Sequence, residues 1–295
     1  MMSSAFPKGF LWGSSTNAQQ FEGGWNKGGK GVSIADVREI PGMPEDASFE
    51  DFKNAAQHYT HYKEDIAYYG LMGFGIYRFT MAWTRIFPNG NDPEPNEEGL
   101  AFYDRVLTEL EKYGIQPVVT LYAYDLPLHL LESYDGWMSR QCIQDYLRYV
   151  ETVINRFKGR VKYWVPFNEQ NFLRIDEEYM TGYKAKNEKE IFRMEHHFNL
   201  AYAQATALIH RIDPAAKPAA MSAICAFTRQ PAIPPMWKRP TGLFTGLGML
   251  LPTCMPGNNT LATILRRWRK SMIYPTSSWT GTWTSLPKRS RISYL

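Results

Sequence analysis

The chain has 295 residues, 44% of them apolar and 15% aromatic, so it can bury a sizeable core. Its net charge of +4 is unevenly distributed: residues 1–213 hold all 29 acidic residues and 22 of the 33 Lys and Arg, whereas residues 214–295 hold 11 basic residues and no acid. Such a composition excludes a wholly disordered chain, and it sets the last segment apart from the rest.

Three cysteines, Cys142, Cys225 and Cys254, are scattered without a C-x-x-C pair. This spacing argues against a disulfide framework or a zinc site and is typical of a reducing compartment. The start of the chain has no basic segment followed by an apolar core, and no run reaches the roughly 18 apolar residues of a spanning helix. We therefore expect a cytoplasmic protein without a secretory signal or a membrane span.

The first 213 residues alternate short apolar runs with longer amphipathic segments. The apolar runs are rich in β-branched and aromatic residues, which predicts strands. These strands are Gly9–Thr16, Gly75–Met81, Gln116–Tyr122 and Val161–Glu169, with Pro218–Cys225 as a candidate fifth.

Helices are predicted where apolar residues recur at helical spacing between the strands. They fall around Asp51–Tyr69, within 96–114, around 143–154 and around Glu188–Ile212. Gly114 is expected to provide the C-cap of the second helix.

Strands separated by one helix each must be parallel, and such a sheet closes most simply into an eight-stranded (β/α)8 TIM barrel. The predicted fold class is therefore α/β, with about the first four to five β/α units of the barrel present. A doubly wound sheet is the alternative, but no Gly-x-Gly-x-x-Gly or P-loop pattern follows a strand. Four or five strands leave open edges through which copies of the chain could self-associate.

The sequence after about Pro218 has frequent prolines and no helical or strand period. Three interpretations remain open. A nucleic-acid-binding extension would explain the mixture of basic and aromatic residues, and a disordered tail is disfavoured by the many large apolar residues. We favour a reading-frame shift near residues 217–223. The chain is accordingly divided into barrel sequence over 1–216 and an aberrant basic tail over 217–295, and no nucleic-acid partner is expected.

Glu169 places a carboxylate at the carboxyl end of a predicted barrel strand, where active sites of this architecture lie. It is either a catalytic acid or a strand-end glutamate paired with a base. Asn168 beside it is either a ligand-facing amide or a cap of the next turn. His58 and His61 lie one helical turn apart, but no third ligand is apparent and no metal is expected. Five aromatic residues could stack on sugar rings or fill the core: Trp12, Trp25, Trp83, Tyr122 and Tyr124.

Four long stretches carry a family resemblance: FPKGFLWGSSTNAQQFEGG, HYTHYKEDIAYYGLMGFGIYRFTMAWTRIFPNG, PNEEGLAFYDRVLTELEKYGIQPVVTLYAYDLPLHL and VKYWVPFNEQN. Through them, residues 6–216 resemble the N-terminal part of glycoside hydrolase family 1, the β-glucosidases and 6-phospho-β-glucosidases. The resemblance implies a TIM barrel, in agreement with the predicted strands and helices, and no cofactor.

By this resemblance Glu169 matches the general acid/base, which protonates the leaving glycosidic oxygen and then activates water. Asn168 matches the residue that hydrogen-bonds the sugar 2-hydroxyl, and Gln20 matches an amide that binds the glycone. Arg78 matches an arginine placed near the nucleophile, and Tyr124 is a further candidate for substrate binding. Without the resemblance, Gln20 and Arg78 could be strand-end residues in structural hydrogen bonds, and for Arg78 we would favour that role.

Two residues near the site depart from the family pattern. Ala123 stands where the family usually has histidine, and Gln170 stands where it usually has proline, a replacement compatible with the 6-phospho branch. Trp164 and Phe167 are close to Glu169 in the sequence, and strand alternation decides whether they face it.

The larger departure is the second carboxylate. A retaining glycosidase needs one about 5–5.5 Å from the first, and the family carries it in a Glu-Asn-Gly motif on the seventh strand. These 295 residues contain no such motif, and no acid follows Asp213. We therefore expect a retaining β-glycosidase by descent, for β-glucosides or 6-phospho-β-glucosides, that is inactive in this form. The alternative is a non-catalytic, sugar-binding half-barrel fragment. The expected partner is a small-molecule glycoside, with no membrane involved.

Overall fold

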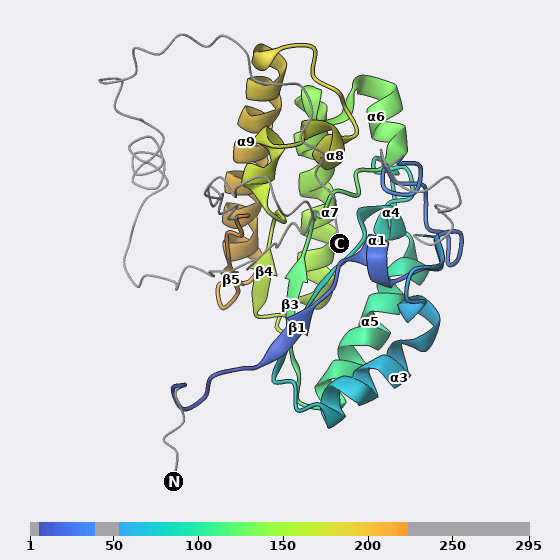
Figure 1. Ribbon diagram of the computed structural model, residues 1–295, viewed down its shortest axis with the longest axis vertical. Coiled ribbons are helices and arrows are strands. Elements are labelled where there is room, and N and C mark those ends of the chain that lie inside the picture. The colour runs from blue at the N-terminus through green and yellow to red at the C-terminus, as the bar shows by residue number, and fades with distance from the viewer. Residues whose placement is uncertain (1–5, 39–52, 224–295) are drawn as a thin grey trace, which may run out of the picture. The chain divides into compact units, whose positions relative to one another are not determined.

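The computed structural model describes residues 6–38 and 53–223. This part of the chain forms one five-stranded parallel sheet whose strands lie side by side in chain order (Figure 1). The strands are β1 (Gly13–Ser15), β2 (Ile76–Thr80), β3 (Gln116–Thr120), β4 (Tyr163–Val165) and β5 (Lys217–Pro218). An order that never reverses is the order of a barrel, so the doubly wound alternative is wrong for this sheet.

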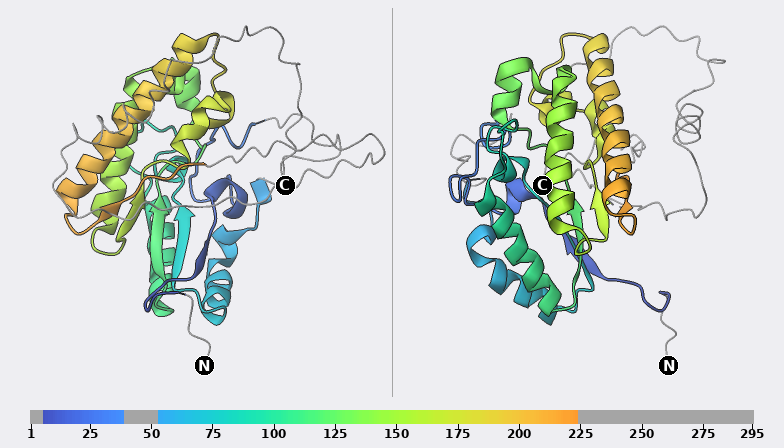
Figure 2. Two further views of the ribbon diagram at one scale, coloured as in Figure 1. Left: turned by 60° about the vertical axis from the view of Figure 1, so that its left-hand side comes forward. Right: turned by 180° about the vertical axis from the view of Figure 1, so that it is seen from behind.

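One long helix lies between each pair of consecutive strands. The helices are α3 (His58–Leu71), α5 (Glu97–Lys112), α7 (Gln141–Phe157) and α9 (Glu188–Ile212). Seen from behind, α5, α7 and α9 lie in front of the strands, so they cover the same face of the sheet (Figure 2). The four predicted helices are confirmed, and Gly114, with φ 65°, follows the end of α5 as expected.

The helix predicted around Asp51–Tyr69 is interrupted, because Lys53 and Asn54 are helical, residues 55–57 are not, and α3 starts at His58. Ala55 and Gln57 have φ values of 46° and 58°, which interrupt any helix there. The backbone N–H of Tyr59 instead donates to the carbonyl of Glu22 at 2.8 Å, so the loop after β1 occupies the N-terminus of α3.

Short elements follow the strands at their carboxyl ends. They are α1 (Ala18–Phe21), α4 (Trp83–Ile86), α6 (Leu128–Tyr134), the 3₁₀ turns η1 (Gly136–Met138) and η2 (Gln170–Arg174), and α8 (Glu177–Thr181). None of them is predicted, because pieces of three to seven residues are too short to show a helical period. The strand predicted over Val161–Glu169 ends at Val165, where Pro166 removes a backbone donor.

The sheet has two faces of very different size. Strand alternation turns Tyr77, Phe79, Val119 and Trp164 toward the helices, where they join the large core. The opposite face carries a small apolar cluster of Val118, Val165 and Met221, against which Ile76, Tyr163 and Ala219 pack. Most of the buried apolar surface therefore lies between the sheet and its helices.

Several predictions fall outside the described residues. These are the tail after Ala223, Cys225 and Cys254, and the end of the candidate fifth strand. Of that predicted strand, β5 includes only Pro218, and residues 219–223 are described but lie outside any strand. In the described residues, no helix combines the length and the apolar character that crossing a membrane requires.

Candidate active site

The segments that leave β3 and β4 meet at one pair of residues. The Tyr124 hydroxyl donates a 2.6 Å hydrogen bond to Glu169 Oε2. The two strands are parallel and pair from Val118 opposite Tyr163 to Thr120 opposite Val165, so the chain leaves both at the same edge of the sheet. Glu169 is half-buried and so stays accessible from solvent.

A continuous series of hydrogen bonds connects this pair to β2. Asn168 Nδ2 donates to the Tyr124 hydroxyl at 2.6 Å, and Arg78 Nη2 donates to Asn168 Oδ1 at 2.5 Å. Arg78 Nε donates to Thr120 Oγ1 at 2.8 Å. The structure thus brings Arg78, Asn168, Tyr124 and Glu169 together, with Thr120 anchoring the arginine.

Both residues of the central pair have strained backbones. Tyr124 has φ 64° and Glu169 has φ 45°, in the left-handed region that non-glycine residues seldom adopt. Asp125 Oδ1 accepts a 3.0 Å hydrogen bond from the backbone N–H of Ala123, and the N–H of Phe172 donates to the carbonyl of Glu169 at 2.7 Å. Strain held in place by local contacts is typical of functional sites.

Burial controls the charge of the groups near this carboxylate. It raises the pKa of Tyr124, and the Glu169 carboxylate raises it further, so the hydroxyl is a neutral donor. Burial lowers the pKa of Arg78, and attraction to Glu169 opposes this change. The guanidinium stays charged because the ordinary pKa of arginine is far above neutrality. Glu169 therefore has a fixed donor in contact and a cation close by.

Four of the aromatic candidates belong to the core rather than to the site. Trp83, Tyr122, Trp164 and Phe167 are almost fully buried among the residues between the sheet and the helices. Trp164 faces the helices because it alternates with Val165, which lies on the opposite face. Neither Trp164 nor Phe167 therefore shares the face of the sheet on which Arg78 lies.

Gln20 is outside the hydrogen-bond series. It belongs to α1, its side chain is exposed, and its Oε1 accepts a 2.9 Å bond from Asn17 Nδ2. Trp12 is 58% exposed and packs edge-on against Phe10. Trp25 lines a small cavity instead of contacting Glu169.

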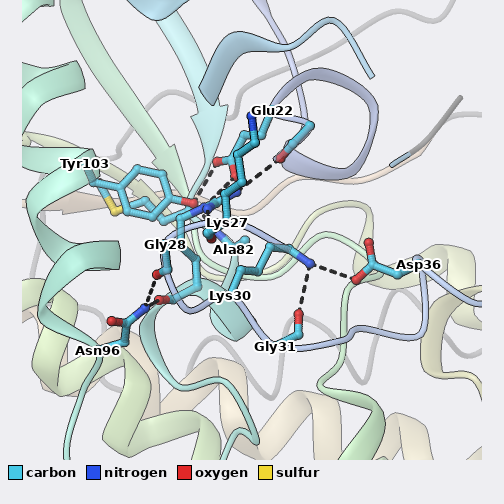
Figure 3. Close-up of polar contacts among 12 residues, drawn as sticks. Glu22, Lys27, Gly28, Lys30, Gly31, Asp36, Ala82, Asn96 and Tyr103 are labelled. Atoms are coloured by element: carbon cyan, nitrogen blue, oxygen red, sulfur yellow. Dashed lines mark hydrogen bonds and ion pairs between the residues drawn. The ribbon is translucent and has the colours of Figure 1, made fainter. Parts of the chain in front are cut away.

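A buried ion pair anchors the glycine-rich segment after β1 (Figure 3). Arg85 Nε donates to Glu22 Oε2 at 3.0 Å, and the two side chains are 0% and 7% exposed. The Tyr103 hydroxyl donates to Glu22 Oε1 at 2.7 Å, and Lys30 Nζ pairs with Asp36 Oδ2 at 2.7 Å. Figure 3 shows the Tyr103 hydroxyl directed at Glu22 and the Lys30 amine directed at Asp36. These contacts hold the loop against α4 and α5.

A cavity of about 20 Å³ lies beside this loop, lined by Glu22, Thr84 and Asp125 among others. Thr84 Oγ1 and Asp125 Oδ2 are enclosed there without a hydrogen-bond partner in the described part of the chain. The space fits one water molecule, which could bond to both. Burial raises the pKa of Asp125 to about 6. Glu169 lines neither this cavity nor a second one of about 10 Å³.

Of the two histidines of α3, one makes structural contacts and the other is exposed. His58 is buried with Nδ1 at 2.6 Å from Asp65 Oδ2, and its ring packs on Phe21, whereas His61 is exposed. Over residues 6–38 and 53–223, no three His, Cys, Asp or Glu side chains are grouped so as to hold a metal ion.

Three residues of the site region are not predicted from the sequence. Thr120 could have been found, because it lies in a predicted strand on the same face as Val118. Asp125 directly follows the strand-end aromatic residues. Arg38 carries no local signal, since its partners lie far away in the sequence: its Nη2 donates to the carbonyls of Tyr124 at 2.9 Å and Tyr179 at 2.7 Å.

Comparison with known proteins decides the family. Residues 2–235 match the family model of glycosyl hydrolase family 1. The chain belongs to this family. It is 44% identical over 219 residues to a 6-phospho-β-glucosidase of Clostridium longisporum, covering 71% of this chain and 46% of that protein. It is 42% identical over 251 residues to the aryl-phospho-β-D-glucosidase BglH of Bacillus subtilis, covering 82% and 52%.

Solved structures of the family have the same fold. A β-glucosidase from Thermotoga maritima in complex with castanospermine superposes with a TM-score of 0.66 at 31% identity, covering 72% of this chain and 48% of that one. The fold is thus that of the TIM-barrel β-glucosidases, as predicted. This family 1 chain spans about half the length of the relatives it matches.

Proposed function

We propose that Glu169 is the general acid/base of a retaining β-glycosidase site for β-glucosides or 6-phospho-β-glucosides. The observation that carries the proposal is the hydrogen-bond series from Arg78 through Asn168 and Tyr124 to Glu169, at the carboxyl ends of three parallel strands. A strand-end glutamate with a purely structural role would be expected to pair with a base. Glu169 instead accepts from a neutral hydroxyl and stays accessible.

The residues around the acid support distinct roles in such a site. A carboxyl group that protonates a leaving oxygen and later takes a proton from water must reach solvent and keep one orientation. Tyr124 would hold Glu169 Oε2 in place, and Asn168 would offer its amide to the sugar 2-hydroxyl. Arg78 would keep a nearby carboxylate ionised. Gln20 stays a candidate for the glycone on the resemblance alone.

We also propose that these 295 residues by themselves do not turn over substrate. Retention requires a second carboxylate on the other side of the sugar ring to form the glycosyl-enzyme. No acid follows Asp213, and the hydrogen-bonded group near Glu169 holds no second carboxylate. The two named relatives act on phosphorylated glucosides, and the Thermotoga enzyme is a β-glucosidase, so both substrate types stay in the proposal.

The test compares the full chain with its Glu169→Gln variant on 4-nitrophenyl β-D-glucopyranoside and on its 6-phosphate. We expect no hydrolysis above the variant's background for either substrate. We also expect calorimetric binding of at least one of the two glycosides that Asn168→Ala weakens. Substantial hydrolysis abolished by Glu169→Gln would contradict the inactivity, and absence of any glycoside binding would contradict the site itself.

The second candidate function is a non-catalytic, sugar-binding half-barrel. It is favoured by the fact that Arg78, Asn168 and Tyr124 are already assembled without the second carboxylate. It predicts sugar binding that survives Glu169→Gln. Self-association through the exposed strand β1 would be its natural quaternary state, and gel filtration would detect it. A cytoplasmic setting stays a prediction of the sequence.

A further inference from the structure

Two arginines of the described chain are partly buried without a carboxylate partner. Of the five arginines there that are not exposed, Arg85, Arg148 and Arg160 each have a carboxylate oxygen within 4 Å. Arg38 and Arg78 have none among the residues that the structure describes, and both lie at the carboxyl ends of the strands. Arg78 is accounted for by the proposed site, whereas Arg38 is not.

The hydrogen bonds of Arg38 pair some of its N–H groups with neutral oxygens only. Nη2 donates to two backbone carbonyls, those of Tyr124 and Tyr179, and Nη1 reaches Gln19 Oε1 only at 3.5 Å. The guanidinium lies 3.9 Å above the ring of Tyr179. Burial lowers the pKa of Arg38, and attraction to Asp176 and Asp125, neither of which lies within ion-pair distance, offsets this only in part.

One donor of Arg38 is still available to a ligand. Nε has no partner among the described residues, and it is not one of the unpartnered atoms enclosed by protein, so it reaches solvent. A desolvated cation with a free donor is suited to an anionic oxygen, and bonds between ionised groups are the stronger kind. Structural carbonyl contacts alone would not explain why a full charge is kept there.

The position of Arg38 connects it to the candidate acid. Tyr124 receives the Arg38 bond at its backbone carbonyl and donates from its hydroxyl to Glu169, so one tyrosine separates the two groups. The Tyr124 ring lies 5.2 Å from that of Tyr179 and 6.3 Å from that of Phe172. Tyr179 and Phe172 are only partly buried, so a sugar or an aryl group could stack on the part of their rings that stays accessible.

We propose that Arg38 binds an anionic group, a phosphate or a carboxylate, carried by the glycoside held at Glu169. The inference rests on the proposed glycoside site and adds to it a residue that selects charged over neutral ligands. The anion can belong to the sugar, as a 6-phosphate, or to the aglycone, as a carboxylate. The same chemistry at Arg38 recognises either one.

The experiment measures dissociation constants of the full 295-residue chain by calorimetry at low salt. One ligand pair is 4-nitrophenyl β-D-glucopyranoside and its 6-phosphate, and the other is phenyl β-D-glucopyranoside and its 4-carboxyphenyl analogue. Sodium phosphate alone is the third arm. Arg38→Gln removes the charge but keeps a donor for the carbonyls, Arg38→Lys keeps the charge, and Arg105→Met is the control at an exposed arginine paired with Glu98.

We expect one anionic glycoside to bind about tenfold more tightly than its neutral counterpart. Arg38→Gln should bring that ratio to about one while the neutral ligand's constant changes less than about twofold, and Arg38→Lys should keep part of the ratio. The pair that shows the preference identifies the source of the anion. A ratio unchanged in Arg38→Gln, or equal weakening of both members, would mean a purely structural clamp and would overturn the inference.

The phosphate arm separates this inference from the proposed function. If no glycoside binds but phosphate binds the wild type and Arg105→Met and not Arg38→Gln, the anion site stands and the glycoside site falls. If neutral glucosides bind and no anion is preferred, the glycoside site stands and the role of Arg38 falls. If neither phosphate nor any glycoside binds, both fall.

Discussion

The buried ion pair of Glu22 and Arg85 allows a direct test of how the loop after β1 is held. Glu22→Gln keeps the shape of the side chain but removes the charge opposite Arg85, whose side chain is fully buried. Burial alone would lower the pKa of Arg85, and attraction to Glu22 more than reverses this. After the substitution the groups facing the guanidinium are neutral, among them the carbonyls of Gly23 at 3.2 Å and Lys27 at 3.4 Å.

The expected loss of stability follows from this geometry. Removing one partner of a buried ion pair costs about 3–5 kcal/mol, because the other charge is left desolvated. Tyr103→Phe removes the hydrogen bond to the same carboxylate and the acceptor of the Ala82 backbone N–H, and it should cost about 1.5–3 kcal/mol. The double variant should cost less than the sum, since both changes act on one group.

Urea unfolding of the full chain, followed by tryptophan fluorescence, would measure these free energies. Glu98→Gln is the matched control, because its pair with Arg105 is 52% and 43% exposed and should contribute less than about 1 kcal/mol. A loss below about 1 kcal/mol for Glu22→Gln, or strict additivity with Tyr103→Phe, would refute the view that this pair anchors the loop.

Two further predictions concern Asp125 and Tyr124. Asp125 has a pKa raised by burial to about 6 from an ordinary value of 3.8, so the folded chain holds a proton that the unfolded chain has lost, and stability should fall by about 2 kcal/mol as the pH rises from 4 to 6. Asp125→Asn should lack this decline in urea unfolding at each pH, and parallel curves for both proteins would contradict the assignment. Tyr124→Phe removes the hydroxyl that bonds Glu169 and Asn168 and should weaken calorimetric binding of a neutral aryl β-glucoside about fivefold to tenfold. Tyr113→Phe, at an exposed ring, serves as its control, and equal affinities in all three proteins would show that Tyr124 does not orient the site.

The long elements of the fold are predictable because each one has a local pattern. The bounds of α9 agree with the predicted Glu188–Ile212, since Asn187 caps its first turn and accepts from the N–H groups of Lys189 and Glu190. The start of α3 is missed because a non-local contact decides it. There the N–H of Tyr59 bonds to Glu22, which no window around Tyr59 contains.

The residues of the candidate site also differ in whether the sequence alone reveals them. Glu169 and Asn168 can be found from their place at the end of an apolar run, and Arg78 from strand alternation and the family resemblance. Arg38 cannot, because the carbonyls it binds lie 86 and 141 residues further along the chain. Backbone strain at Tyr124 is equally hidden, since tyrosine has no preference for a left-handed conformation.

The two faces of the sheet explain why the hydrogen-bonded group around Glu169 can form without a second carboxylate among the described residues. Each β/α unit buries the stripe of its own helix against its own strands, so the core under the helices is complete within residues that are close in sequence. The inner face of a barrel is filled by layers of side chains from alternate strands all around it. In the described part of the chain, the apolar side chains gathered on that face are the small cluster of Val118, Val165 and Met221 and the residues packed on it.

The contacts that hold Glu169 likewise come from neighbouring β/α units. Glu169 is held by Tyr124 and, through it, by Asn168 and Arg78, all from three neighbouring strand ends. Its geometry therefore needs nothing from across the barrel. A second carboxylate on the far side of a bound sugar would need a strand opposite β4, and no strand of the described sheet lies there because β1 to β5 follow one another along a single arc.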